Sequence, residues 1–345
     1  MADLVLDLND RRPVWAIPDW AVGEIRAAAP DDWTVHMAST LADGSGDGVG
    51  GLSAEVLEAL AGARVYMGFG IPPQVLEAAG ETLEWVHTGT AGVGGSLHEP
   101  MRRSKVRLTN AAGIHGPPMA EWVLAVILHF FRGLDFAVRG QARGRWESSH
   151  FQAADAPVRE LSGATVGILG YGGIGREIAR RLVPLGARVL GLRRQPPLEE
   201  VDREGARHLH GDEGLAALLA ESDVLVVAAP ETPATRGIVS RDRLLAMRPG
   251  ALLVNASRGS LVDEEALVEV LEEGHLRGAA LDVFRTEPLP EGHPLWELPN
   301  VLITPHVSAV SRGFWRRHTD LIVENLERFL AGRPLLNEVD RDAGY

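Results

Sequence analysis

Short apolar runs alternate with longer amphipathic stretches along most of the chain. The alternation is most regular from residue 164 onward, where ATVGILG (164–170), GGIGREIARRLVPLG (172–186) and ARVLGL (187–192) follow one another. Apolar runs bounded by turn residues are typical of buried strands, and apolar positions spaced three and four residues apart are typical of helices. We therefore expect a strand, a helix and a second strand here, as in a parallel sheet covered by helices.

The same alternation continues as far as residue 305. Further strands are expected at DVLVVAAP (223–230), ALLVNAS (251–257), RGAALDVF (277–284) and NVLITP (300–305). Helices are expected near 214–220, 241–247 and 263–274. The whole series predicts a doubly wound parallel sheet of about six strands.

The first hundred residues show a weaker form of the same pattern. Strands are expected at TVHM (34–37), RVYMGF (64–69) and LEWVHT (83–88). Apolar runs separated by amphipathic stretches again favour an α/β arrangement. We therefore expect a second, smaller α/β domain in this part of the chain.

Two helices determine how we divide the chain into domains. An apolar helix from residue 119 to about 136 would connect the two sheets. A helix at 315–330 has no place in the second sheet, so we expect it to return to the first domain. The predicted division is a discontinuous smaller domain of residues 1–112 and 307–345, and a larger domain of residues 113–306.

Composition and charge exclude several classes of protein. The chain has 345 residues, with 34 basic and 47 acidic side chains and a formal net charge of -13, so its overall field disfavours nucleic acids and anionic membranes. It contains no cysteine, which excludes disulfides, thiol nucleophiles and cysteine-ligated zinc. The start, MADLVLDLND, does not resemble a signal peptide. We therefore expect a cytoplasmic protein without nucleic-acid or membrane partners.

A glycine-rich turn follows the strand at 164–170. The sequence GYGGIG contains Gly170, Gly172 and Gly175, with Gly173 and Ile174 between them, at the start of a predicted helix. In a dinucleotide fold the first glycine permits the tight turn, the second lets the backbone approach a pyrophosphate, and the third lets helix and strand pack closely. The phosphates would then lie at the helix N-terminus, where unpaired amides favour anions. This context predicts a dinucleotide-binding site.

A second glycine-rich pattern and a histidine pair elsewhere in the chain are not interpreted as binding sites. Gly46, Gly48 and Gly51 have the same glycine spacing but no strand before them, so DGSGDGVGG reads as a surface loop. His208 and His210 stand two residues apart, yet no third metal ligand is evident near them. We therefore expect a solvated histidine pair and no metal site.

Two arginines stand where dinucleotide-binding chains usually carry an acid for the adenosine ribose. Arg193 and Arg194 directly follow the strand at 187–192. A guanidinium cannot accept hydrogen bonds from ribose hydroxyls, but it donates paired hydrogen bonds to a phosphate. The doublet is interpreted as a site for the 2′-phosphate of NADP. The alternative is that both arginines are solvated on a loop.

Four chemically active side chains come just after predicted strands. They are Arg258 after ALLVNAS, Asp282 and Glu287 in and after RGAALDVF, and His306 after NVLITP. Open α/β sheets bind ligands at the carboxyl ends of their strands. A histidine with a neighbouring carboxylate is a common general acid and base near neutral pH. We therefore expect these residues to lie close together and to act on one substrate.

The motifs together resemble the D-isomer-specific 2-hydroxyacid dehydrogenase family. The resemblance extends over about residues 83–336 and includes TNAAGIHGPPMAEWVLA, GYGGIG, NASRGSLVDEEAL, ALDVFRTEPLP and HPLWELPNVLITPH. It implies two Rossmann-like domains. One would be a doubly wound nucleotide-binding domain, and the other a smaller, discontinuous, flavodoxin-like substrate domain.

The resemblance also implies roles for individual residues. The catalytic arginine, glutamate and histidine of the family fall on Arg258, Glu287 and His306, and its nicotinamide-contacting aspartate falls on Asp282. Hydride would pass from the nicotinamide to the keto carbon. Arg258 would hold the substrate carboxylate, and His306, supported by Glu287, would deliver the proton.

Further contacts follow from the same resemblance. The backbone amides that bind the substrate carboxylate fall on Ala91, Gly92 and Val93, and additional cofactor contacts fall on Pro230 and Ala256. The chain departs from the family at one position of this loop. The family often has an aspartate after the Gly-Val pair, where this chain has glycine 94, so we expect a looser substrate loop.

The predicted activity is NADPH-preferring reduction of a small 2-oxo acid, such as glyoxylate or hydroxypyruvate, to the D-2-hydroxy acid. The arginine doublet resembles that of the NADPH-preferring glyoxylate and hydroxypyruvate reductases. A homodimer formed through the long helix after Pro118 is implied by the family. Two alternatives stay open. They are a dinucleotide-sensing scaffold of the same fold, as in corepressors that resemble this family, and an NAD-dependent dehydrogenase of another substrate class.

Overall fold

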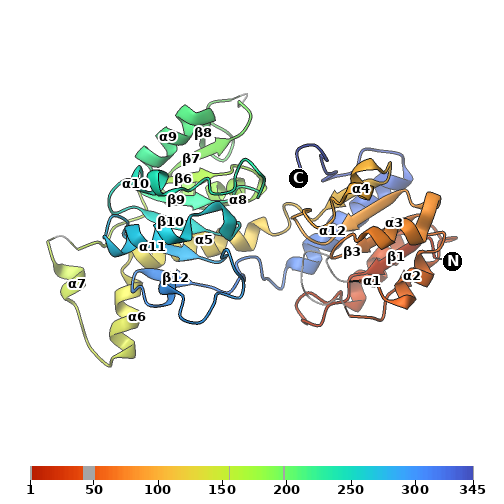
Figure 1. Cartoon of the computed structure of the whole chain (residues 1–345), viewed down its shortest axis with the longest axis horizontal. Coiled ribbons are helices and arrows are strands. Elements are labelled where there is room, and N and C mark those ends of the chain that lie inside the picture. Colours follow the sequence, from red (N-terminus) through yellow and green to blue (C-terminus); the bar gives the residue numbers. More distant parts are fainter. Residues whose placement is uncertain (1, 42–50, 155, 197–198, 345) are drawn as a thin grey trace. The chain divides into compact units, whose positions relative to one another are not determined.

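The chain divides into two compact units in a computed structural model that describes residues 2–41, 51–154, 156–196 and 199–344. The first unit is Met1–His115 with Val310–Tyr345, and the second is Gly116–Ala309 (Figure 1). Each unit is built around one parallel sheet, so the predicted α/β class with two Rossmann-like sheets is confirmed. Gly46 and Gly48, which we interpreted as part of a surface loop, lie outside the described residues.

The first unit contains a five-stranded parallel sheet, counted over the described residues. Its strands are β1 (Leu4–Asp7), β2 (Val35–Met37), β3 (Val65–Gly68), β4 (Trp85–Thr88) and β5 (Arg107–Asn110). Their order is β2-β1-β3-β4-β5, which is the flavodoxin-like order. Both β3 and β4 are buried along their whole length, as expected for parallel strands covered on both faces.

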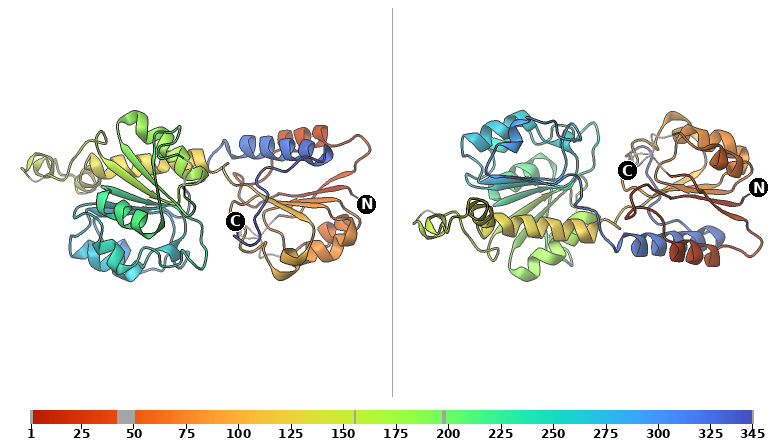
Figure 2. Two further views of the ribbon diagram at one scale, coloured as in Figure 1. Left: turned by 90° about the horizontal axis from the view of Figure 1, so that it is seen from above. Right: turned by 90° about the horizontal axis from the view of Figure 1, so that it is seen from below.

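Helices cover both faces of this sheet (Figure 2). They are α1 (Asp19–Ala28), α2 (Ala54–Leu60), α3 (Pro73–Ala79), α4 (Glu99–Arg103) and α12 (Phe314–Leu330). The C-terminal helix α12 lies beside α1 on one face, and α2, α3 and α4 lie on the other (Figure 2). Ile25 and Ile322 belong to the same buried cluster, so the chain returns to its first unit because α12 completes that core.

The second unit contains a seven-stranded parallel sheet within the part of the chain that the structure describes. Its strands are β6 (Thr165–Leu169), β7 (Arg188–Arg193), β8 (Arg207–His210), β9 (Val224–Val227), β10 (Leu252–Asn255), β11 (Gly278–Leu281) and β12 (Val301–Ile303). The order is β12-β11-β10-β9-β6-β7-β8. The chain direction across the sheet reverses between β6 and β9, and this switch point is where doubly wound sheets bind nucleotides.

The second unit has helices on both faces of its sheet and others that project away from it (Figure 2). They are α5 (Gly116–Phe131), α6 (Leu134–Ala142), α7 (Ser149–Gln152), α8 (Gly173–Leu182), α9 (Gly211–Glu221), α10 (Arg241–Leu245) and α11 (Glu264–Glu272). One buried cluster joins α5 and α8 to the sheet, and another joins α9, α10 and α11 to it. The site loops therefore rest on a sheet packed on both sides.

Three strands were not predicted. The second sheet has seven strands over the described residues where about six were expected, because β8 was not among those predicted. Its sequence RHLH is only partly buried, as is common at a sheet edge, so it lacks the apolar run that marks an inner strand. The first unit has two more, β1 and β5, of which RLTN is largely polar in sequence although mostly buried.

The predicted helix at 119–136 is two helices in the structure. Helix α5 ends at Phe131, and Gly133 adopts a φ of 67° before α6 begins. This left-handed conformation suits glycine and ends a helix. Beyond it, α6 and α7 extend away from the sheet of the second unit as a projecting arm (Figure 1).

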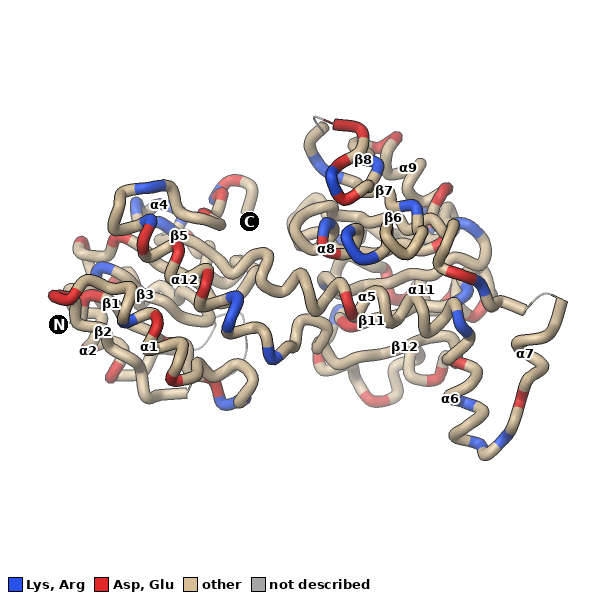
Figure 3. Tube along the Cα trace, turned by 180° about the vertical axis from the view of Figure 1, so that it is seen from behind, with Lys and Arg blue, Asp and Glu red and all other residues tan. Residues whose placement is uncertain are grey.

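Acidic and basic positions are mixed along the elements of both units (Figure 3). The negative charge of -13 is therefore spread over many elements. None of the described helices has the length and apolar character that crossing a membrane requires.

Candidate active site

The glycine turn joins β6 to α8 at the switch point of the second sheet. Gly170 has a φ of 97°, and a Cβ there would lie 2.4 Å from the Cα atom of Ala229, just after β9. At Gly175 a Cβ would lie 3.0 Å from Cδ2 of Tyr171 and 3.2 Å from the carbonyl oxygen of Gly170. Because only glycine lacks a Cβ, these two positions hold strand, turn and helix close together.

The start of α8 leaves room for an anion. A Cβ on Gly172 would meet no atom within 4 Å among the described residues, so this side of the turn is open. Gly173 and Ile174 are the first two residues of α8, where backbone N–H groups have no partner within the helix. An open backbone with unpaired amides at a helix N-terminus fits a pyrophosphate.

The other predicted cofactor residues lie at the same edge of the sheet. Arg193 is the last residue of β7 and is half-buried, and Arg194 follows it and is exposed. Pro230 follows β9 and is exposed, whereas Ala256 follows β10 and is buried. Since β6, β7, β9 and β10 are parallel neighbours, their carboxyl ends share one edge. The assignment of these residues to a cofactor stays a prediction.

A hydrogen-bonded group beside the glycine turn was not predicted. The hydroxyl of Tyr171 donates to the carboxylate of Asp202 at 2.7 Å, and a ring nitrogen of His208 lies 3.3 Å from the same oxygen. Our interpretation of His208 as solvated is therefore wrong, because its side chain is only 5% exposed. The group ties the segment after Arg193 to the glycine turn. Only the tyrosine inside GYGGIG could have suggested it.

Arg258 lies on a short loop after β10. The amide of Asn255 donates to its carbonyl oxygen at 3.0 Å, and one guanidinium nitrogen donates to the carbonyl of Ser257 at 2.8 Å. A Cβ on the next residue, Gly259, would lie 1.9 Å from the carbonyl carbon of Phe284. The loop that carries Arg258 therefore packs backbone to backbone against the loop that leads to Glu287.

His306 and Glu287 form a direct pair. Nδ1 of His306 lies 2.7 Å from Oε2 of Glu287. The other carboxylate oxygen of Glu287 accepts the N–H of Phe284 at 2.9 Å, so both oxygens are held. The structure thus brings together two of the side chains that the sequence places after different strands.

The contact raises the pKa of His306 and lowers the pKa of Glu287. The hydrogen bond from Glu287 raises the pKa of His306 above its ordinary value, although partial burial and the charge of Arg258 oppose the rise. Burial would raise the pKa of Glu287, but hydrogen bonds from His306 and Phe284 and the charge of Arg258 outweigh it and lower that pKa. The pair therefore favours the protonated imidazole more than an isolated histidine would.

Asp282 holds the loop that carries His306. Its fully buried carboxylate accepts hydrogen bonds from the Thr304 hydroxyl and from the N–H groups of Val307 and Ser308. The backbone N–H of His306 also donates to the Asp282 carbonyl at 2.8 Å. These bonds support His306 in a left-handed conformation with a φ of 54°, which costs about 1–3 kcal/mol for a residue with a side chain. The nicotinamide contact predicted for Asp282 stays a prediction.

The predicted substrate loop lies in the first unit, after β4. The Asn110 amide donates to the carbonyl oxygen of Ala91 at 2.9 Å, and the Thr90 hydroxyl donates to the carbonyl oxygen of Gly92 at 2.7 Å. Val93 is buried. Among the described residues, the N–H groups of Ala91, Gly92 and Val93 donate no hydrogen bond. Three unpaired amides held by fixed carbonyls are suited to bind a carboxylate.

The geometry of the second unit supports one kind of chemistry. It combines a turn whose open backbone fits an anion with the cationic side chain of Arg258 and the titratable imidazole of His306, all beyond the carboxyl ends of one sheet. The turn has the open backbone that a dinucleotide requires, and a bound nicotinamide would supply a hydride. Chemistry that adds a hydride to a carbonyl needs a proton for the oxygen and a positive charge beside it. His306 and Arg258 carry these two properties.

Comparisons with known proteins agree with this geometry. The sequence model described as "D-isomer specific 2-hydroxyacid dehydrogenase, NAD binding domain" matches residues 124–308. The chain is 33% identical over 270 residues to the glyoxylate reductase/hydroxypyruvate reductase of Homo sapiens, covering 78% of this chain and 80% of that protein. It is 37% identical over 213 residues to the glycerate dehydrogenase of Methylorubrum extorquens, covering 59% of this chain and 64% of that protein.

A solved structure extends the likeness to the whole chain. The D-isomer specific 2-hydroxyacid dehydrogenase of Xanthobacter autotrophicus Py2, solved in complex with NADPH and MES, has 32% sequence identity and a TM-score of 0.79. The match covers 100% of this chain and 99% of that one. The chain therefore belongs to the D-isomer-specific 2-hydroxyacid dehydrogenase family, whose members are NAD(P)-dependent oxidoreductases.

Proposed function

We propose that this protein is an NADPH-preferring reductase that converts a small 2-oxo acid to the D-2-hydroxy acid. The observation that carries the proposal is the 2.7 Å contact between His306 and Glu287. Glu287 holds Nδ1 and favours the protonated ring, so Nε2 is available to donate a proton. Within the described chain, Nε2 of His306 has no hydrogen-bond partner.

The proton and charge requirements of the reaction match the residues. As the carbonyl carbon of the substrate accepts a hydride, its oxygen takes the proton from Nε2 of His306, and the imidazole becomes neutral. Arg258 stabilises the negative charge that develops on this oxygen and pairs with the substrate carboxylate. The unpaired amides of Ala91, Gly92 and Val93 are the second proposed carboxylate contact.

The preference for NADPH is supported by the residues at the end of β7. Arg193 stands where an acidic residue would bind the ribose hydroxyls of NAD. Its guanidinium has no ion-pair partner among the described residues. A 2′-phosphate would supply that partner, and Arg194 adds a second positive charge. The bound NADPH in the Xanthobacter relative also supports this choice.

Glyoxylate and hydroxypyruvate are the first candidate substrates. The human relative is named for both, and the Methylorubrum relative is named for glycerate, the reduced form of hydroxypyruvate. An NAD-dependent dehydrogenase of another substrate class and a dinucleotide-sensing scaffold are the alternatives. The scaffold would need neither the supported proton donor nor the free amides.

We also propose that two copies of the chain associate through the second unit. The projecting arm, defined as residues 134–152, exposes Trp146 to 99%, Val138 to 57% and Leu134 to 46%. Monomeric proteins rarely expose several large apolar side chains on one projecting segment. Burial against a second copy would remove them from water.

A steady-state survey of 2-oxo acids with NADPH and with NADH tests the proposal. We expect turnover with glyoxylate or hydroxypyruvate, a D-configured product from hydroxypyruvate, and a loss of about a hundredfold or more in His306→Ala. Binding of NADPH to His306→Ala, followed by fluorescence, controls for folding. Absence of nicotinamide oxidation with the whole panel would favour the scaffold, and unchanged turnover in the variant would refute the assignment of His306.

A further inference from the structure

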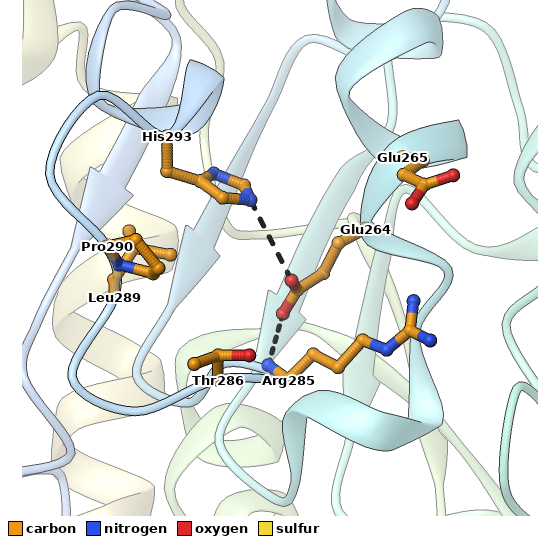
Figure 4. A pocket seen from close by; sticks show the side chains of 7 residues that line it. All are labelled: Glu264, Glu265, Arg285, Thr286, Leu289, Pro290 and His293. Atoms are coloured by element: carbon orange, nitrogen blue, oxygen red, sulfur yellow. Dashed lines mark hydrogen bonds and ion pairs between the residues drawn. The ribbon is translucent and has the colours of Figure 1, made fainter.

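A second carboxylate lies behind the turn that carries Glu287. Glu264 is the first residue of α11, and its side chain is only 11% exposed. It faces a small cavity of about 240 Å³ whose wall includes Arg285, Thr286 and His293 (Figure 4). The mechanism proposed above does not use this carboxylate, although it lies close in sequence to Arg258.

Glu264 binds the backbone of the turn directly. Its Oε1 atom accepts the N–H of Arg285, and Nε2 of His293 lies 4.0 Å from Oε2 (Figure 4). The preceding N–H, that of Phe284, donates to Glu287. Two successive peptide groups are thus held by two carboxylates, one from α11 and one from the turn itself. This places Glu264 one peptide away from the contact that orients the Glu287 carboxylate.

The turn at Phe284 and Arg285 is held from two sides. Gly259 already touches the Phe284 backbone on the side of the Arg258 loop. Glu264 holds the following residue, Arg285, from α11. The turn is therefore fixed at adjacent residues from two elements. Moving it would change the distance between Glu287 and His306, which is 2.7 Å.

Burial makes the ionised form of Glu264 energetically costly at this site. Its pKa is raised by burial and, to a smaller extent, by the charge of Glu287, while the bond from Arg285 and the charge of His293 oppose the rise. A largely buried carboxylate near another carboxylate is unfavourable unless it accepts hydrogen bonds. The N–H of Arg285 is the principal bond that Glu264 makes here.

We propose that Glu264 is a positioning residue for the His306–Glu287 pair: by holding the N–H of Arg285, it fixes the turn from which Glu287 binds His306. The inference rests on the proposed function, since it concerns the proton donor of that reaction. It assigns Glu264 no contact with substrate or cofactor. Its effect passes through the backbone of Arg285 and Phe284.

Glu264 could affect His306 in two ways, by holding the turn through the Arg285 N–H or by its negative charge alone. The two effects must be separated, because a nearby anion would itself favour a protonated imidazole. Two conservative variants divide these effects. Glu264→Gln removes the charge but keeps an oxygen that can accept the Arg285 N–H, whereas Glu264→Asp keeps the charge but shortens the reach by one methylene. Glu265→Gln and Glu265→Asp are the matched controls, since Glu265 is exposed and lines the same cavity.

The experiment measures the pKa of His306 by NMR in the full chain, with the signal assigned by its loss in His306→Ala. We expect Glu264→Gln to keep the raised pKa of His306 and Glu264→Asp to lower it. Turnover should fall about tenfold in Glu264→Asp, with the KM for NADPH changed less than twofold. Both Glu265 variants should behave as the unaltered protein, and thermal melting of all four checks folding.

Two results would overturn the inference. A lowered His306 pKa in Glu264→Gln with an unchanged value in Glu264→Asp would show a charge effect without positioning. An unchanged pKa in both would show no influence of Glu264 on the pair. The NMR readout needs no turnover, so a protein that fails to reduce any 2-oxo acid would refute the proposed function without deciding this question.

Discussion

His306 and Glu287 come from loops after two neighbouring strands, β12 and β11, and meet with Nδ1 and Oε2 at 2.7 Å. The contact joins a half-exposed imidazole to a carboxylate whose other oxygen is held by a backbone N–H. It favours the protonated ring and leaves the second ring nitrogen available. The consequences of this pair are open to measurement.

The pH dependence of reduction should follow the His306–Glu287 pair. Because reduction needs a protonated His306, kcat/KM should fall as pH rises through its pKa, which Glu287 raises above the ordinary 6.5. Glu287→Gln should move this fall to lower pH and slow turnover about tenfold or more. The measurement is a pH profile of kcat/KM for both proteins, and identical profiles would contradict the assignment.

Stability should depend on pH through the same pair. The raised pKa of His306 contributes stability that is fully present below 6.5 and is lost as pH rises through the folded-state pKa. The lowered pKa of Glu287 contributes stability that is present above its ordinary 4.5 and is lost as pH falls through the folded-state value. The Tm difference between the unaltered protein and Glu287→Gln should therefore be largest between pH 4.5 and pH 6.5, where both contributions are present. A difference that stays constant from pH 3 to 9 would contradict this.

The cofactor preference should depend on the arginine doublet. Arg193→Asp combined with Arg194→Ala removes two positive charges and restores an acceptor for ribose hydroxyls. We expect the ratio of kcat/KM with NADPH to that with NADH to fall at least about tenfold, since charge-assisted hydrogen bonds contribute about 1.5–3 kcal/mol each. Activity with NADH serves as the folding control. An unaltered protein that already prefers NADH would refute the preference.

Gly259 should be intolerant of any side chain. A Cβ there would lie 1.9 Å from the Phe284 carbonyl carbon, so Gly259→Ala must separate the loops that carry Arg258 and Glu287. We expect a loss of about 1–3 kcal/mol in the free energy of unfolding and a marked loss of turnover. Gly23→Ala is the control, because a Cβ there meets nothing within 4 Å among the described residues and Gly23 lies inside α1. Equal melting of both variants would contradict the packing argument.

The projecting arm should control association between copies of the chain. Trp146→Glu combined with Val138→Glu places charges on its exposed apolar surface, and this should convert a dimer to a monomer. Light scattering after size-exclusion chromatography measures the mass, and circular dichroism checks the fold. A monomeric unaltered protein would refute the proposal, as would a dimer that persists in the variant.

Local sequence was sufficient for several parts of this protein. The order of the six inner and edge strands other than β8, the tight turn at Gly170 and the strand-end positions of Arg258, Glu287 and His306 all follow from neighbours in the chain. Periodicity, glycine content and the residues that end strands are local properties, and the parallel sheet then places those strand ends at one edge. This is why the candidate site could be predicted before its geometry was known.

Other parts were decided only by the tertiary structure. The edge strand β8 lacks an apolar run and forms because β7 offers it a partner. Tyr171 meets Asp202, and Glu264 meets Arg285, across 31 and 21 positions of sequence. Asp282 binds the His306 loop from a neighbouring strand. Such contacts depend on which strands are neighbours and on how two loops pack, and no local pattern of residue types specifies either.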